Sequence, residues 1–199
     1  MGDAPLGRAV FLDRDGVIVV NHTDYVRSWE QVQFLPGALD ALRRLAGTPL
    51  AVVVVTNQSA VGRGLMSLDQ MWAINAGIAA TVSVQGGRLD RVYACPHRPD
   101  EGCACRKPAP GMLLAAAADM GLDLSRSYLV GDAVSDVEAA MAVGAQPILV
   151  LTGRGEAQRA GLRAKGYDVP VVADLAEAVA WILARETGDG DRQSADGVG

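Results

Sequence analysis

Short apolar runs alternate with longer amphipathic segments along the chain, and this alternation restricts the fold more than any other feature. The runs are unbroken, as strands are when both faces of a sheet are covered, and they occupy residues 9–12, 50–55, 91–94, 127–131 and 147–151. Helical segments separate and follow them at residues 36–47, 68–87, 110–121, 135–144 and 174–186. We therefore predict the α/β class, with a doubly wound parallel sheet and right-handed crossovers.

The chain length predicts one domain of ordinary size. With 199 residues, half of them hydrophobic, the chain can bury a substantial core but is short for two complete domains. We place this single domain at residues 1–187. The remaining segment, GDGDRQSADGVG at 188–199, has too few apolar residues to pack, so we predict a disordered tail there.

The charge and the hydropathy exclude several classes of partner. A formal net charge of −5 argues against charge-driven binding to nucleic acid or to anionic membranes. No apolar run approaches the roughly 18 residues of a membrane span, and the N-terminal residues MGDAPLGRAV lack the order of a signal peptide. We expect a cytoplasmic protein and, because no assembly surface is visible in the sequence, a monomer.

Polar side chains follow the ends of three predicted strands. Asp13 and Asp15 follow the first strand, Thr56 and Asn57 the second, and Asp132 the fourth. Ligands of open parallel sheets collect beyond the carboxyl ends of the strands. These residues are therefore expected to converge on one edge of the sheet.

Carboxylates brought together in this way repel one another unless a cation or a proton intervenes. Mg²⁺ suits such a cluster, because it takes one or two carboxylates together with water and a substrate phosphate. A D-x-D run by itself is more often a turn or a helix cap. Beside Thr56 and Lys107, which can supply a hydroxyl and a charge for phosphate, Asp13 and Asp15 instead indicate phosphoryl transfer, with one Asp as nucleophile and the other as proton donor.

Four segments, FLDRDG, VVVVTNQ, CRKPAPGM and VGDAVSD, resemble in order and spacing the motifs of the haloacid dehalogenase (HAD) superfamily of phosphatases. The resemblance implies a HAD-like Rossmannoid fold in which Asp13 is the nucleophile and Asp15 the general acid and base. It also implies that Thr56 and Lys107 stabilise the phosphoryl group. Mg²⁺ is then held by Asp13, by Asp132 and by Asp15, the last through its backbone carbonyl. Asp136 is either a partner of this site or a solvated carboxylate at the start of a helix.

All three cysteines of the chain lie in one short segment with a histidine. Cys95, His97, Cys103 and Cys105 give the pattern C-x-H-x5-C-x-C, and three thiolates with one imidazole form a tetrahedral structural zinc site. Several Pro and Gly residues mark a loop with no core in which to bury the cysteines. Arg106 and Lys107 immediately follow the last ligand, so we expect zinc to stabilise the loop that presents both cations.

Residues from about 8 to 153, together with the TGRG run at 152–155, resemble the D-glycero-D-manno-heptose 1,7-bisphosphate phosphatase family of the superfamily. The resemblance implies a small phosphorylated sugar as substrate, loss of its 7-phosphate through an aspartyl-phosphate intermediate, and no large cap domain. It further implies substrate contacts from three segments: Asn21, His22 and Tyr25; Asn57, Gln58 and Ser59; and Arg106.

Two departures from the family pattern leave the substrate open. Relatives often carry Lys directly after the Asp of the fourth motif, where this chain has Ala133. The segment VVNHTDYV is also about one residue longer than the usual loop. A histidinol-phosphate phosphatase, or a phosphatase of another small sugar phosphate, would share the same catalytic groups.

Two alternatives lie outside the phosphatases. A phosphoryl-accepting signalling domain also has an acidic Mg²⁺ cluster on a parallel sheet, but it is shorter and lacks a zinc loop. A catalytically silent scaffold stabilised by zinc is the other, and the complete set of predicted catalytic residues argues against it.

Overall fold

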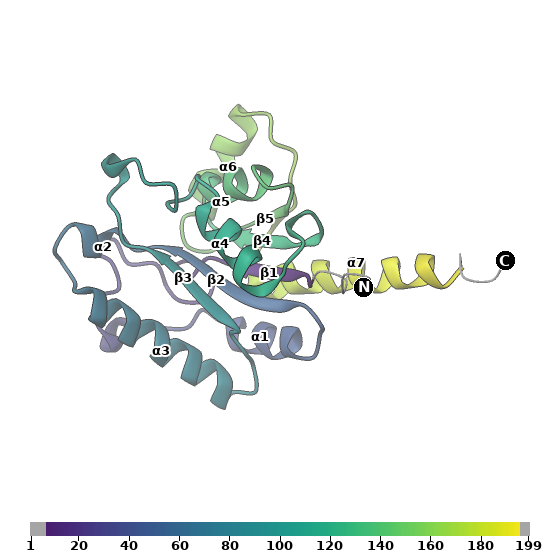
Figure 1. Ribbon diagram of the computed structural model, residues 1–199, viewed down its shortest axis with the longest axis horizontal. Helices are drawn as coiled ribbons and strands as arrows, with labels where there is room; N and C mark the ends of the chain where they lie inside the picture. Colours follow the sequence, from purple (N-terminus) through teal and green to yellow (C-terminus); the bar gives the residue numbers. More distant parts are fainter. Residues whose placement is uncertain (1–6, 196–199) are drawn as a thin grey trace.

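A parallel β-sheet forms the centre of the molecule (Figure 1). The computed structural model describes residues 7–195, with side chains through residue 187. Within these residues the sheet has six strands in the order β3-β2-β1-β4-β5-β6, and every pairing is parallel. The strands are β1 Ala9–Leu12, β2 Ala51–Asn57, β3 Arg91–Cys95, β4 Tyr128–Gly131, β5 Gln146–Val150 and β6 Val171–Val172. The predicted parallel α/β architecture is confirmed.

Helices cover both faces of this sheet (Figure 1). On one face α1, α3 and α7 pack against the strands, and on the other face lie α4, α5 and α6. The main helices are α1 Ala38–Ala46, α3 Leu68–Val84, α4 Gly111–Met120, α5 Val134–Met141, α6 Gly155–Ala164 and α7 Leu175–Ala195. A single turn, α2 Ser59–Gly62, follows β2.

Burial on both faces explains the unbroken apolar strands. In β1, Val10 and Leu12 enter the core beneath α1 and α3, whereas Ala9 and Phe11 enter the core beneath α4. Because successive side chains point to opposite faces, a strand covered on both sides has no position for a polar residue. The first polar position after β1 is Asp13, where the strand has ended.

Three differences separate this fold from the predicted elements. Helix α6 and strand β6 were not predicted, because α6 buries only Gly155 and Leu162 and β6 has two residues. Helix α7 continues to Ala195, beyond residue 186, where the last predicted helix ends. Extending an existing helix needs no new nucleus, so weak helix formers can continue it. The predicted disorder of 196–199 concerns residues outside the described part.

The chain order reverses at the centre of the sheet. From β1 the strands run to β2 and β3 on one side and to β4, β5 and β6 on the other. The carboxyl ends of β1 and β4 therefore flank the switch point, which is where open α/β sheets bind ligands. Among the described residues, no helix has both the length and the apolar composition needed to cross a membrane.

Candidate active site and metal centre

Asp13 lies directly beyond β1, at the switch point of the sheet. Its N–H donates to the carbonyl of Val130 at 2.9 Å, which continues the ladder between β1 and β4. Its carboxylate Oδ1 accepts the N–H of Arg14 at 2.8 Å, and the residue is buried. The carboxylate is thus held in one position at the carboxyl edge of the strands.

Three buried carboxylates meet at this position. Asp13, Asp132 and Asp136 each bring an oxygen within 4.8 Å of the other two. Asp132 follows β4, and Asp136 lies in the first turn of α5, where its Oδ2 accepts the N–H of Ala133 at 3.0 Å. A Cβ at Gly131 would overlap the side chain of Asp136, so glycine is required for this approach. Asp136 is therefore part of the cluster and not a solvated carboxylate at a helix start.

Lys107 is the buried cation that faces two of these carboxylates. Its Nζ is 3.1 Å from Asp13 Oδ1 and 2.6 Å from Asp136 Oδ1, and it donates to the carbonyl of Val55 at 2.7 Å. Burial acts to lower the pKa of Lys107, but attraction by Asp13 and Asp136 outweighs it, so the net pKa is raised. Lys107 is consequently a charged ammonium beside the carboxylate of Asp13.

Arg154 is a second cationic side chain that contacts the cluster, through Asp132. Its backbone N–H donates to Asp132 Oδ2 at 2.8 Å, and its Nη2 lies 2.9 Å from Asp132 Oδ1. Burial and the charge of Asp13 raise the pKa of Asp132, whereas Arg154 lowers it, and the net direction is upward. Burial raises the pKa of Asp136 to about 6, although Lys107 lowers it.

The donor set fits a hard divalent cation. Three carboxylates face two cationic side chains, Lys107 and Arg154, so the cluster carries excess negative charge when all five are ionised. Carboxylate oxygens beside an open cleft are the ligands that Mg²⁺ takes together with water and phosphate. The residues present are thus compatible with the predicted magnesium site.

Asp15 is oriented by a buried arginine. Arg14 Nη2 contacts both carboxylate oxygens of Asp15, at 3.0 and 2.9 Å, and also donates to Gln58 Oε1 at 2.9 Å. Gln58 Nε2 in turn lies 2.8 Å from Asp15 Oδ2 and 2.8 Å from Thr56 Oγ1. Charge-assisted bonds of this kind restrict the rotamer of the carboxylate. Arg14 and Gln58 therefore act as positioning residues for Asp15 and Thr56.

A cleft of about 650 Å³ opens above these groups. Five of the seven predicted substrate-contact residues line it, namely Asn21, Tyr25, Asn57, Ser59 and Arg106. Its remaining lining includes Asp13, Asp15, Thr56, Lys107, Asp136, Arg154, Arg63 and Ser135. The structure therefore brings the predicted catalytic side chains and most of the predicted substrate contacts into one space.

Two predicted substrate contacts, His22 and Gln58, do not line this cleft, and a third, Asn57, is bonded to the backbone of Lys107. His22 Nε2 is hydrogen-bonded to the carbonyl of Gln31 at 3.0 Å, and Gln58 is buried, with its Nε2 bonded to Thr56 Oγ1. Asn57 lines the cleft but exchanges two hydrogen bonds, each of 3.1 Å, with the backbone of Lys107. Its amide thus fixes the segment that carries the buried ammonium.

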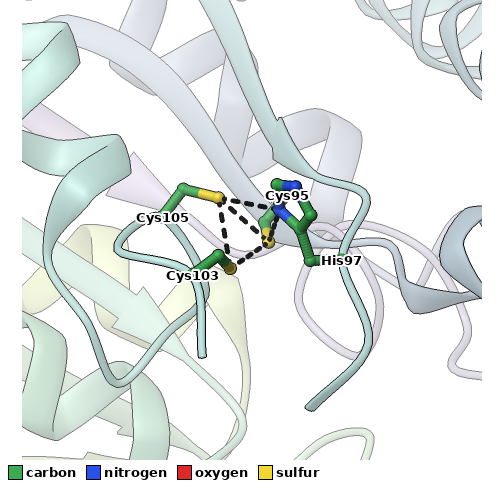
Figure 2. A group of neighbouring side chains, drawn as sticks. All are labelled: Cys95, His97, Cys103 and Cys105. Carbon is green, nitrogen blue, oxygen red and sulfur yellow. Dashed lines mark hydrogen bonds between the residues drawn. The ribbon is translucent and has the colours of Figure 1, made fainter. Parts of the chain in front are cut away.

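The cysteines and the histidine gather as predicted (Figure 2). Cys105 Sγ lies 3.2 Å from Cys95 Sγ, 3.5 Å from Cys103 Sγ and 3.3 Å from His97 Nδ1. A tetrahedron with metal–ligand bonds of 2.0–2.3 Å has edges of about 3.5–3.8 Å, so these separations are close to those of a zinc site. None of the cysteines forms a disulfide.

The cysteine cluster is anchored to the protein core, which corrects the expectation of a loop with no core nearby. Cys95 ends β3 and is fully buried, because β3 continues the sheet to that point. Cys103 and Cys105 pack against the same apolar cluster. Burial raises the pKa of the Cys95 thiol to about 12, so its thiolate requires a cation at neutral pH.

Sequence reasoning assigned no role to Arg14 or Arg154. The position of Arg14 between two predicted catalytic aspartates was a usable signal. Arg154 belongs to the TGRG run, which marked the resemblance without a residue role. Its contact with Asp132 spans 22 positions of sequence, so only the fold reveals it.

Comparisons with known proteins agree with this geometry. The HAD-hydrolase-like family model matches residues 104–178. The D-glycero-β-D-manno-heptose-1,7-bisphosphate 7-phosphatase of Pseudomonas putida is 46% identical over 149 residues, covering 75% of this chain and 85% of that protein. The enzyme of the same name from Escherichia coli is 38% identical over 184 residues, covering 88% and 87%.

The solved structures include a similar protein with its ligands. The crystal structure of D,D-heptose 1,7-bisphosphate phosphatase from B. bronchiseptica, complexed with magnesium and phosphate, superposes with a TM-score of 0.83. That protein is 37% identical, and the match covers 89% of this chain and 99% of the other.

Proposed function

This chain belongs to the D-glycero-β-D-manno-heptose-1,7-bisphosphate 7-phosphatase family of HAD-like hydrolases, and on that premise we propose that it hydrolyses the 7-phosphate of heptose 1,7-bisphosphate. The observation that carries the proposal is the buried carboxylate of Asp13, which lines the cleft with the ammonium of Lys107 at 3.1 Å. A fixed carboxylate beside a fixed cation suits attack on a phosphate ester.

In the proposed reaction, a carboxylate oxygen of Asp13 attacks phosphorus and the bond from phosphorus to the sugar oxygen breaks. Asp15 gives its proton to the departing oxygen, which leaves as the sugar hydroxyl. A water molecule then attacks phosphorus, Asp15 takes a proton from it, and the acyl–phosphate bond breaks. Inorganic phosphate is released, and the Asp13 carboxylate and the protonated Asp15 are restored.

The surrounding side chains stabilise the transferred group. Lys107 brings positive charge to the phosphoryl oxygens, and Thr56 offers its hydroxyl from the end of β2. Asp13 and Asp132, with the backbone carbonyl of Asp15, would hold Mg²⁺. When bound, the ion would offset the charge of the carboxylates and of the substrate phosphate.

The zinc site has a structural role in this proposal. Cys95, His97, Cys103 and Cys105 would hold Zn²⁺ and so fix the segment that continues into Arg106 and Lys107. Arg106 also donates to the carbonyl of His97 at 3.2 Å. Its position in the cleft suits contact with the part of the substrate remote from Asp13.

The proposed setting follows from the sequence. We place the enzyme in the cytoplasm as a monomer with one catalytic domain at residues 1–187. A small phosphorylated sugar is its partner, and the net charge of −5 argues against nucleic acid as another.

Phosphate release from both anomers of heptose 1,7-bisphosphate and from histidinol phosphate tests the proposal. We expect one of the heptose bisphosphate anomers to give the highest kcat/KM of the three substrates. We also expect rapid-quench labelling to detect phosphate on Asp13. Asp13→Asn should remove turnover by several orders of magnitude because the attacking group is lost. Asp40→Asn, the same change at an exposed position of α1, serves as the control and should retain it.

Three outcomes contradict the proposal. If rapid-quench labelling detects no modified Asp13 during turnover, the covalent route is excluded. If the protein prefers histidinol phosphate, it is a histidinol-phosphate phosphatase and not a heptose bisphosphate phosphatase. A phosphorylated protein that accumulates without releasing phosphate indicates a signalling domain.

A further inference from the structure

Arg154 lies between the acidic cluster and the open cleft. Its Nη2 is 2.9 Å from Asp132 Oδ1 and 4.0 Å from Asp13 Oδ2, while 53% of its side chain remains exposed. The same residue lines the cleft. The guanidinium therefore faces both the carboxylates and the space in which a ligand would bind.

The backbone at this position is fixed, in contrast to the side chain. Thr152 Oγ1 donates to the carbonyl of Gly16 at 2.6 Å, and Gly153 has φ of 59° at a position where a Cβ would overlap Gly16 and Asp132. The N–H of Arg154 is bonded to Asp132 Oδ2. The guanidinium can therefore leave Asp132 while the loop keeps its place.

The segment that follows Asp132, residues 133–141, contains no basic residue. The residue after Asp132, Ala133, is buried and offers only a methyl group. Arg154 immediately precedes α6, whose residue Gln158 bonds the N–H of Val134 at 3.3 Å, so the starts of α5 and α6 lie together. The guanidinium of Arg154, directly before α6, therefore supplies a positive charge to the cleft close to the start of α5.

We propose that Arg154 is a phosphate-binding residue that alternates between two partners. Without a cation in the acidic cluster, its guanidinium pairs with Asp132. With Mg²⁺ bound, the guanidinium turns into the cleft and binds the phosphoryl group of the substrate, supplying a positive contact in addition to that of Lys107. The second half of this inference rests on the proposed function.

The two partners predict effects of opposite sign when the guanidinium is removed. Arg154 competes with Mg²⁺ for Asp132, so its loss should tighten magnesium binding. Arginine binds phosphate through two parallel hydrogen bonds, so its loss should weaken phosphate binding. A residue that only maintains the local structure would weaken both.

Calorimetric titration of the zinc-loaded protein separates these effects without any need for turnover. For Arg154→Ala we expect about fivefold tighter Mg²⁺ binding, the size of one partly exposed ion pair. In saturating Mg²⁺ we expect about tenfold weaker binding of inorganic phosphate. Arg63→Ala removes the same charge from the same cleft and should tighten Mg²⁺ by less than about twofold.

A second variant tests whether a positive charge placed at position 133 can replace that of Arg154. Ala133→Lys combined with Arg154→Ala should regain most of the phosphate affinity, and Arg154→Lys should keep part of it. With the heptose bisphosphate, Arg154→Ala should raise KM about tenfold and lower kcat less.

The inference is overturned if Arg154→Ala weakens Mg²⁺ and phosphate together, leaves both unchanged, or matches Arg63→Ala. If the wild-type protein turns over no heptose bisphosphate, the proposed function fails. The Mg²⁺ and phosphate titrations then still decide whether Arg154 alternates between its two partners.

Discussion

Lys107→Met tests whether the buried charge network holds the site together. Its Nζ pairs with Asp13 and Asp136, and in each of these three residues no more than 6% of the side chain is exposed. Removing one partner of a buried ion pair leaves charge without compensation, at a cost of about 3–5 kcal/mol. For a protein of this size that lowers Tm by roughly 2–4 °C for each kcal/mol, or about 6–20 °C.

Urea unfolding in Mg²⁺-free buffer measures this loss, and two variants control for it. Lys165→Met makes the same substitution in an ion pair with Glu138 at 2.9 Å, where 51% of the lysine side chain is exposed. That pair should contribute at most about 1 kcal/mol. Adding Asp136→Asn to Lys107→Met removes one of the stranded charges and should recover a measurable part of the loss.

The reasoning is refuted if Lys107→Met costs no more stability than Lys165→Met. It is also refuted if Asp136→Asn adds a further loss to Lys107→Met instead of restoring stability. In either case, the negative charges of Asp13 and Asp136 would not depend on Lys107 for their neutralisation.

Three further predictions concern the metals and the loop beside Asp132. Cys103→Ser should lower zinc content and Tm together, as elemental analysis and calorimetry measure; a wild-type protein purified without stoichiometric zinc would exclude the site. Dialysis against Mg²⁺-free buffer should stop phosphate release until Mg²⁺ is added back, and zinc should stay bound throughout. Turnover that persists after metal analysis has shown the protein to be free of Mg²⁺ would contradict this. Gly153→Ala should cost about 1–3 kcal/mol in urea unfolding, because φ is 59° and a Cβ would overlap Asp132 and Gly16. Gly166→Ala, with φ of 69° and open space, should cost less, and equal losses would show that the overlap is unimportant.

The parallel sheet was predictable because burial on both faces leaves a direct mark on the sequence. An unbroken run such as 52–55 of β2 has no polar position, since helices cover both sides of it. Helix α6 left no such mark, because Leu162 is the only large apolar side chain among its buried residues. Strand β6 depends on pairing with β5, and two valines carry too little pattern to predict a partner.

The acidic residues of the site were predictable for a topological reason. Asp13 and Asp132 follow strands that turned out to be neighbours, so the rule that strand ends meet at one edge brought them together. The inward placement of Asp136 could not be predicted, because it depends on the absence of a side chain at Gly131. The catalytic roles of these residues and the domain boundary at 187 stay predictions.

The cations of the site come from two separate loops, and this separation gives the two metals different effects on it. Lys107 follows the cysteine cluster, so loss of zinc should displace the ammonium that faces Asp13. Arg154 follows β5 and shares Asp132 with the proposed magnesium site, so magnesium should act on it by competition. Zinc loss and magnesium loss should therefore be distinguishable in one protein. The first should weaken phosphate binding even in saturating Mg²⁺, whereas the second should be fully reversed by adding Mg²⁺.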